Sequence, residues 1–205
     1  SMYGGFNNCG LLAPRPCSYV TIVRSPVARV VSAYEYFCRS CAEFGRQCGR
    51  EHPKELTCPR MTLEQYAAAF QDVYVRAFAG ATSDHAPPQP TLALGEPATA
   101  ADFDAAQAFM RQWRVLVLFT EDLGEAYPLR AVGALLGLPD VAGLREMPHS
   151  NPGTTVVQKK TYFEPARLAD VATRYFAWDQ RFYDWLRSPE YVQPVNVSHA
   201  PQVGA

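Results

Sequence analysis

The stretch "YVTIVRSPVARVVSAYEYF", residues 19–37, decides the fold that we expect. Its first five residues form a continuous apolar run rich in β-branched side chains, which is typical of a buried parallel strand. Ser25 can cap a following helix, and Pro26 suits the first turn of that helix. Apolar residues then recur at helical spacing, which predicts a helix as far as about residue 44.

The order of strand and helix is repeated once further along the chain. The segment "VLVLFT", residues 115–120, is predicted to be a second buried strand. Helices are predicted at residues 61–79 with Thr62 as cap, 100–113 with Thr99 or Asp102 as cap, 121–136 and 165–186. Two buried strands that each lead into a helix indicate an α/β protein with a parallel sheet. Because two strands cannot form a full sheet alone, we expect the domain to be incomplete at its N-terminal side.

The composition favours one globular domain without an extensive charged surface. The chain has 205 residues, of which 48% are hydrophobic, and a formal net charge of -1. This length is sufficient for one domain with a substantial core. A nearly neutral chain offers no general attraction for nucleic acid or for an anionic membrane surface, so any anion site has to be local. No apolar run reaches the length of a membrane span.

Six cysteines and one sequon bear on the cellular compartment. Four of the cysteines lie in an insert at about residues 38–60, namely Cys38, Cys41, Cys48 and Cys58. An even number of clustered cysteines is typical of disulfides in an oxidising compartment. Asn196 begins a glycosylation sequon that is usable only in a secretory lumen. Both features favour a disulfide-bonded glycoprotein of the secretory pathway, with a four-thiolate zinc site as the alternative.

Polar side chains follow the end of the first strand. Ligands of open α/β sheets bind at the carboxyl ends of the strands, where Arg24 lies. Ser25, Arg29, Ser32 and Tyr36 follow at three- and four-residue steps, so they share one helix face. A guanidinium group and a serine hydroxyl near a helix start suit a phosphate group. The alternative is structural: a solvated Arg29, a Ser32 bonded to its own helix, and an Arg24 paired with a carboxylate.

The same segment resembles the 3′-phosphate-binding motif of the Golgi carbohydrate sulfotransferases, a strand followed by "RDPxxRxxSxYxY". It is most similar to the heparan sulfate 2-O-sulfotransferase-like group. The resemblance implies that Arg24 and Ser32 hold the 3′-phosphate of the sulfate donor, 3′-phosphoadenosine 5′-phosphosulfate (PAPS). The chain departs from the family at Ser25, where aspartate is usual, but serine caps a helix about as well. The segments at residues 73–80, 115–139 and 159–186 also resemble the family, in the family's order.

The resemblance implies a three-layer αβα parallel sheet of the P-loop or sulfotransferase type. The sulfotransferase domain would span residues 1–187 and a tail residues 188–205. The family's phosphate loop and catalytic base are expected upstream, so no catalytic residue is assigned. Lys159 and Lys160 would lie in a loop that closes over PAPS.

The resemblance also implies an activity and a location. The enzyme would transfer a sulfuryl group from PAPS to a hydroxyl of a carbohydrate, without a metal ion. It would work in the Golgi lumen as a type II membrane protein whose anchor lies outside this chain.

Two other functions are kept as alternatives. The first is a catalytically inactive sulfotransferase-like module that binds carbohydrate or protein. The second is a nucleotide kinase or another phosphate-binding α/β domain, which would need a G-x-x-x-x-G-K loop that the sequence lacks.

Several other side chains are possible site residues. Arg76 and Arg111 are candidates for contact with an acidic polysaccharide, with a solvated helix face as the alternative. Glu121 follows a strand end, and we expect a structural role for it. His149 is the only histidine next to a candidate site loop, and nothing in the sequence places it as a general base.

Overall fold

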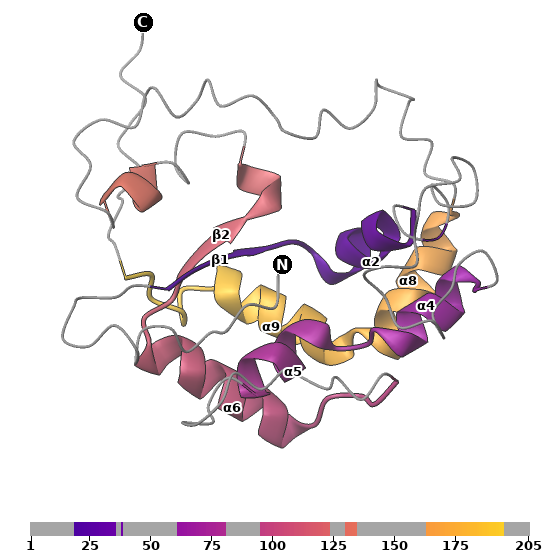
Figure 1. Cartoon of the computed structure of the whole chain (residues 1–205), viewed down its shortest axis with the longest axis horizontal. Helices are drawn as coiled ribbons and strands as arrows, with labels where there is room; N and C mark the ends of the chain where they lie inside the picture. The colour runs from indigo at the N-terminus through magenta and orange to yellow at the C-terminus, as the bar shows by residue number, and fades with distance from the viewer. Residues whose placement is uncertain are drawn as a thin grey trace, which may run out of the picture.

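The structure is a computed structural model, and it describes residues 19–35, 38, 61–80, 95–123, 130–134 and 163–194. Two strands, β1 (Val20–Val23) and β2 (Leu116–Phe119), pair in parallel. In Figure 1, α5, α6 and α9 lie along one side of these strands, and α2, α4 and α8 gather beyond the end of β1. Both predicted strands and their parallel pairing are therefore confirmed, but two strands are too few to establish a three-layer sulfotransferase-type fold.

The two faces of this sheet are covered to different extents. On one face Val23, Val117 and Phe119 join the main core, which α5, α6 and α9 complete. On the other face Leu116 and Leu118 of β2 pack against the helical residues 130–134. The neighbouring β1 residues remain open on that face, with Val20 43% and Ile22 55% exposed. Full burial was predicted for both strands, and it holds only for β2.

Helix α2 (Pro26–Tyr34) begins as its sequence predicts. The Ser25 hydroxyl accepts a hydrogen bond from the backbone N–H of Ala28 at 3.3 Å, and Pro26 occupies the first turn. Val30 is fully buried in a second apolar cluster that also includes residues of α4 and α8. Helix α6 (Ala100–Gln112) begins with a capping box between Thr99 and Asp102, so both predicted capping residues take part.

The prediction of a single helix at residues 61–79 is wrong, because the structure has two helices in this segment. α4 (Leu63–Ala69) is capped by Thr62, and α5 (Val73–Gly80) follows after a break. The break is at Asp72, which has a positive φ of 46° and is only 3% exposed. Its carboxylate accepts hydrogen bonds from the backbone N–H groups of Ala98, Trp178 and Asp179, at 3.1–3.2 Å. These distant bonds outweigh the local helical preference of the segment.

The predicted helix at residues 165–186 is also two helices, α8 (Pro165–Tyr175) and α9 (Ala177–Arg187). The two helices are separated by Phe176, which is fully buried in the second cluster. Asp179, in the first turn of α9, accepts a hydrogen bond at 3.0 Å from the backbone N–H of Val75 in α5. Asp72 and Asp179 therefore cap the N-termini of each other's helices, and both helix breaks have the same cause.

The start of the helix predicted at residues 121–136 is a 3-10 helix, η3 (Thr120–Asp122). Within the segment that was predicted as a tail, two side chains of residues 188–194 contact the rest of the domain. Tyr191 is 5% exposed, and its hydroxyl donates a hydrogen bond to the carbonyl oxygen of Val115. The side-chain amide of Gln193 bonds both the N–H and the carbonyl oxygen of Val117, at 3.1 and 3.3 Å. These residues thus occupy the edge of β2 that faces away from β1.

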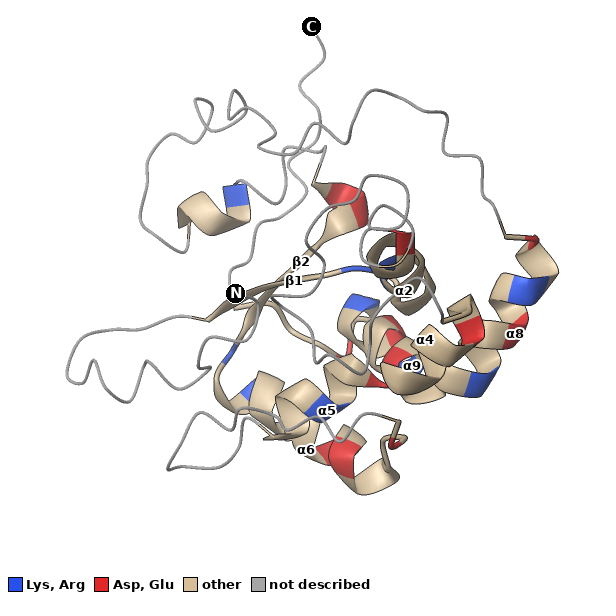
Figure 2. Cartoon of the chain, turned by 45° about the vertical axis from the view of Figure 1, so that its right-hand side comes forward, with Lys and Arg blue, Asp and Glu red and all other residues tan. Residues whose placement is uncertain are grey.

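Charges are mixed over the described helices. Figure 2 shows basic and acidic positions alternating along α8 and interspersed over the other helices. None of the helices in the described part of the chain is long and apolar enough to cross a membrane.

Candidate functional site

Arg24 lies at the carboxyl end of β1, one residue before the cap of α2. Its backbone N–H donates a hydrogen bond to the hydroxyl of Tyr74 at 3.0 Å, which fixes the backbone at the strand end. Its guanidinium group makes no hydrogen bond or ion pair with the other described residues. The carboxylate partner that the structural alternative requires for Arg24 is therefore not found among them.

Ser32 lies on α2, is exposed, and has no hydrogen bond from its hydroxyl to any described residue. The second part of the structural alternative, a bond from this hydroxyl to the helix backbone, is thus not observed. With a rise of about 1.5 Å per residue, Ser32 lies about 10 Å along the helix axis from Ser25. Arg24 and Ser32 are therefore on consecutive elements, and both have free polar groups.

Arg29, which lies between them in the sequence, has a structural role. Its Nη2 atom lies 3.5 Å from both the Asp179 carboxylate and the Phe70 carbonyl oxygen, and only 21% of its side chain is exposed. The guanidinium carbon lies 4.9 Å from the centre of the Tyr74 ring. The solvated Arg29 of the structural alternative is therefore wrong, because this side chain connects α2 to α9.

The Glu121 carboxylate, on η3, contacts the residue that caps α2. Its Oε1 atom accepts a hydrogen bond from the backbone N–H of Ser25 at 2.8 Å. Burial acts to raise the pKa of Glu121, but this N–H bond and the nearby Arg187 guanidinium hold the pKa below its ordinary value. The expected structural role of Glu121 agrees with this contact. Since this carboxylate already accepts the N–H of the cap residue Ser25, a phosphate group here would depend mainly on the side chains of Arg24 and Ser32.

Asp72 and Asp179 are the two charged residues buried among the described ones. Burial raises the pKa of Asp179 to about 6, and the Arg29 guanidinium and the Val75 N–H act in the opposite direction. Burial also raises the pKa of Asp72, against the hydrogen bonds from Asp179 and Ala98. Asp179 contacts both Arg29 of α2 and the backbone of Tyr74 in α5, the residue whose hydroxyl accepts the Arg24 N–H.

Among the described residues, Arg76 and Arg111 make no contact with Arg24 or Ser32. Arg76 donates a hydrogen bond to the Glu96 carbonyl oxygen at 2.9 Å, so part of its guanidinium is engaged before any ligand binds. Lys159, Lys160 and His149 lie outside the described residues. So do all cysteines except Cys38, which is disulfide-bonded. Within the described ranges no three His, Cys, Asp or Glu side chains are grouped to hold a metal ion.

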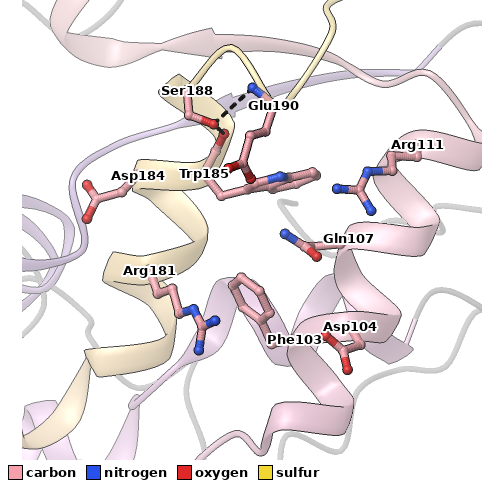
Figure 3. A pocket seen from close by; sticks show the side chains of 9 residues that line it. All are labelled: Phe103, Asp104, Gln107, Arg111, Arg181, Asp184, Trp185, Ser188 and Glu190. Atoms are coloured by element: carbon pink, nitrogen blue, oxygen red, sulfur yellow. Dashed lines mark hydrogen bonds between the residues drawn. The ribbon is translucent and has the colours of Figure 1, made fainter.

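A separate pocket of about 520 Å³ lies between α6 and α9. Figure 3 shows Gln107, Arg111, Arg181 and Trp185 pointing into it from the two helices. Of these four residues, only Arg111 is a site residue predicted from the sequence. Helical spacing was an available signal, since Gln107 and Arg111, like Arg181 and Trp185, are four residues apart. What the sequence could not show is that these two helix faces lie opposite each other.

The chain was also compared with known proteins. A scan against protein-family models found no match, and neither the search of curated proteins nor that of solved structures found a similar protein.

Proposed function

We propose that this chain belongs to a carbohydrate O-sulfotransferase that uses PAPS as sulfuryl donor. The observation that carries the proposal is that Arg24, at the carboxyl end of a parallel strand, and Ser32, on the helix that follows it, both have free polar groups. Their chemistry fits a 3′-phosphate, because a guanidinium group bonds two phosphate oxygens at once and a hydroxyl adds a third donor.

The neighbouring residues support this assignment by fixing the backbone of the turn. Tyr74 accepts the Arg24 N–H, and Glu121 accepts the Ser25 N–H, so the two residues at the turn have little freedom. The backbone of Arg24 would therefore be ordered before the donor arrives, which lowers the entropic cost of binding. When bound, PAPS supplies the sulfuryl group that passes to a carbohydrate hydroxyl. In the part of the chain described here, Arg24 and Ser32 only bind and orient the donor.

The second candidate function is a module that has kept the fold but not the catalysis. The Glu121 carboxylate at the start of α2 favours it, since a negative charge there weakens the attraction for an anion. Under this alternative the protein would bind carbohydrate or protein, without transfer of a sulfuryl group.

Calorimetric titration with adenosine 3′,5′-bisphosphate tests the donor site directly. We expect the chain to bind this ligand more tightly than 5′-AMP or ADP, which lack the 3′-phosphate. Arg24→Ala should weaken binding at least tenfold, because it removes a charge-assisted contact of about 1.5–3 kcal/mol. Ser32→Ala should have a smaller effect. Arg174→Ala is the matched control, since it removes an exposed arginine of α8 that pairs only with Asp170.

Equal affinity for adenosine 3′,5′-bisphosphate and 5′-AMP, or an Arg24→Ala variant that binds like the control, would refute the donor site. A transfer assay with sulfur-labelled PAPS and a mixture of glycan acceptors, carried out on a chain extended upstream of Ser1, then separates the two candidate functions. Binding without transfer would favour the inactive module.

A further inference from the structure

Tyr74 connects the first turn of α5 to the end of β1. Its hydroxyl oxygen lies 3.0 Å from the backbone nitrogen of Arg24, although the two residues are 50 positions apart in the sequence. The guanidinium carbon of Arg29 lies 4.9 Å from the centre of the Tyr74 ring, and the backbone N–H of Tyr74 donates to the buried Asp179 carboxylate. Both ends of the residue are therefore held, and its hydroxyl has a fixed place at the strand end.

The Tyr74 hydroxyl still has a proton to donate. A phenol hydroxyl can accept one hydrogen bond and donate another. Here the oxygen accepts the Arg24 N–H, and no residue in the described part of the chain accepts the hydroxyl proton. The side chain is partly buried, so water only partly replaces the missing acceptor. A donor in this position suits an oxygen atom of a ligand that binds at the strand end.

The protonation state of Tyr74 agrees with a role as donor. Burial raises the pKa of its hydroxyl above the ordinary value, while the Arg29 cation and the Arg24 N–H act in the opposite direction. The hydroxyl therefore keeps its proton at neutral pH. Because the Arg29 cation favours negative charge on the phenol oxygen, it also makes the hydroxyl a stronger hydrogen-bond donor.

The charges around the end of β1 nearly cancel. Arg29 lies 3.5 Å from the Asp179 carboxylate, and Glu121 lies 4.0 Å from Arg187. Arg24 is left without a carboxylate partner among the described residues. Since little net charge remains to attract an anion, directed hydrogen-bond donors have to provide much of the binding.

We propose that Tyr74 is a third binding residue of the anion site, whose hydroxyl accepts the Arg24 N–H and donates its proton to an oxygen of a bound phosphate group. The anion then receives charge-assisted bonds from the Arg24 guanidinium and bonds from the hydroxyls of Ser32 and Tyr74. The N–H, the hydroxyl and the phosphate oxygen form a chain in which each hydrogen bond polarises the next. Assignment of this group as the 3′-phosphate of PAPS rests on the proposed function, whereas the phosphate site itself does not.

Calorimetric titration of the whole chain with adenosine 3′,5′-bisphosphate measures the contribution of the hydroxyl. Tyr74→Phe keeps the ring and its contact with Arg29 but removes the hydroxyl, and we expect about a tenfold loss of affinity. Tyr191→Phe is the matched control, because it also removes a hydroxyl that bonds the backbone, at the Val115 carbonyl oxygen. The control should change affinity less than twofold. Thermal unfolding of both variants checks that the fold is retained.

Replacement of Tyr74 by 3-fluorotyrosine separates a direct bond to the anion from a structural role. Fluorine makes the phenol proton more acidic, so the hydroxyl becomes a better donor and a poorer acceptor. We expect this chain to bind adenosine 3′,5′-bisphosphate at least as tightly as the wild type. Its fluorine NMR signal should shift on addition of inorganic phosphate, and should not shift on addition of adenosine.

Three results would overturn the assignment of Tyr74: a Tyr74→Phe variant that binds like the wild type although Arg24→Ala weakens binding, a fluorotyrosine chain that binds as weakly as Tyr74→Phe, or a fluorine signal that does not move at millimolar phosphate. A failure of the proposed function gives a different pattern. The fluorine signal then moves with inorganic phosphate, but adenosine 3′,5′-bisphosphate binds no more tightly than 5′-AMP. In that case the phosphate site stands and the sulfate donor is refuted.

Discussion

At the scale of single residues, Asp179 shows how a charge is accommodated in the interior. Its side chain is fully buried, so protein groups have to replace the water that would otherwise solvate it. Arg29 approaches one carboxylate oxygen at 3.5 Å, and the Val75 N–H donates to the other at 3.0 Å. These contacts do not fully offset burial, since the pKa of Asp179 remains raised to about 6. Removing one of the partners would leave an uncompensated buried charge.

A raised pKa makes the stability of the protein depend on pH in a defined direction. Between about pH 4 and 6 the folded chain keeps a proton on Asp179 that the unfolded chain loses, so the free energy of unfolding falls as the pH rises through this range. Asp179→Asn removes this contribution. We expect the wild type to lose about 2–3 kcal/mol relative to the variant between pH 4 and 7, at about 1.4 kcal/mol for each unit of pKa.

Urea unfolding of both proteins at several pH values measures the difference. Asp170→Asn serves as control, because that carboxylate is half exposed and pairs with Arg174 on the surface of α8. The free energy of unfolding of Asp170→Asn should have the same pH dependence as that of the wild type. Parallel curves for wild type and Asp179→Asn would show that Asp179 titrates normally in the folded chain.

At the scale of elements, the starts of α5 and α9 are defined by each other. Neither helix has a side-chain cap from its own N-terminal residue among the hydrogen bonds of the described chain. Asp72 instead binds the N–H groups of Trp178 and Asp179 in α9, and Asp179 binds that of Val75 in α5. Each carboxylate also lies at the positive end of a helix dipole, which favours its charged form. The two helices are consequently fixed relative to each other at their N-termini.

Substitution of Asp72 should destabilise both helix starts together. Asp72→Ala leaves two buried N–H groups and one partly buried N–H group without an acceptor, and we expect a loss of about 3 kcal/mol or more in the free energy of unfolding. Asp72→Asn should cost clearly less, because it keeps one acceptor oxygen and asparagine tolerates a positive φ. Chemical denaturation of the two variants shows which of them has the lower free energy of unfolding. A loss of less than 1 kcal/mol for Asp72→Ala would contradict the shared capping.

At the scale of the whole molecule, the segment after α9 completes the core. Tyr191 packs against Trp185 with ring centres 4.9 Å apart, and Gln193 bonds the outer edge of β2. An unpaired strand edge is an open template for another strand, and the Gln193 amide closes it at Val117. The last described residues are therefore part of the folded domain, although their sequence is polar and lacks periodicity.

Substitutions at two neighbouring positions test whether this segment is part of the folded domain. Tyr191→Ala should lower the free energy of unfolding by about 3–4 kcal/mol, the usual cost of removing a buried aromatic side chain. Val192→Ala should change it by less than about 0.5 kcal/mol, since Val192 is 81% exposed. Thermal and urea unfolding of the pair provide the measurement. Similar values for both variants would mean that this segment does not contribute to the core.

The features that the sequence predicted correctly depend on residues close together in the chain. The continuous apolar runs predicted both strands, and Ser25, Thr62 and Thr99 marked helix starts, because a cap bonds a backbone group only three residues away. The position of Arg24 at a strand end followed from the same local patterns. The sulfotransferase fold and activity came from resemblance alone, and they stay predictions.

Only the tertiary structure decided where two long predicted helices break, what Arg29 binds, and which arginines share a pocket. Asp72 and Asp179 are 107 residues apart, and the hydrogen bond between them outweighs a helical pattern that is unbroken at either site. Burial makes each such bond expensive to lose, so a few long-range contacts override many weak local preferences. The local pattern therefore specifies the strands and the helix starts that have their own caps, whereas the pairing of distant buried groups determines where the long predicted helices break and which side chains meet.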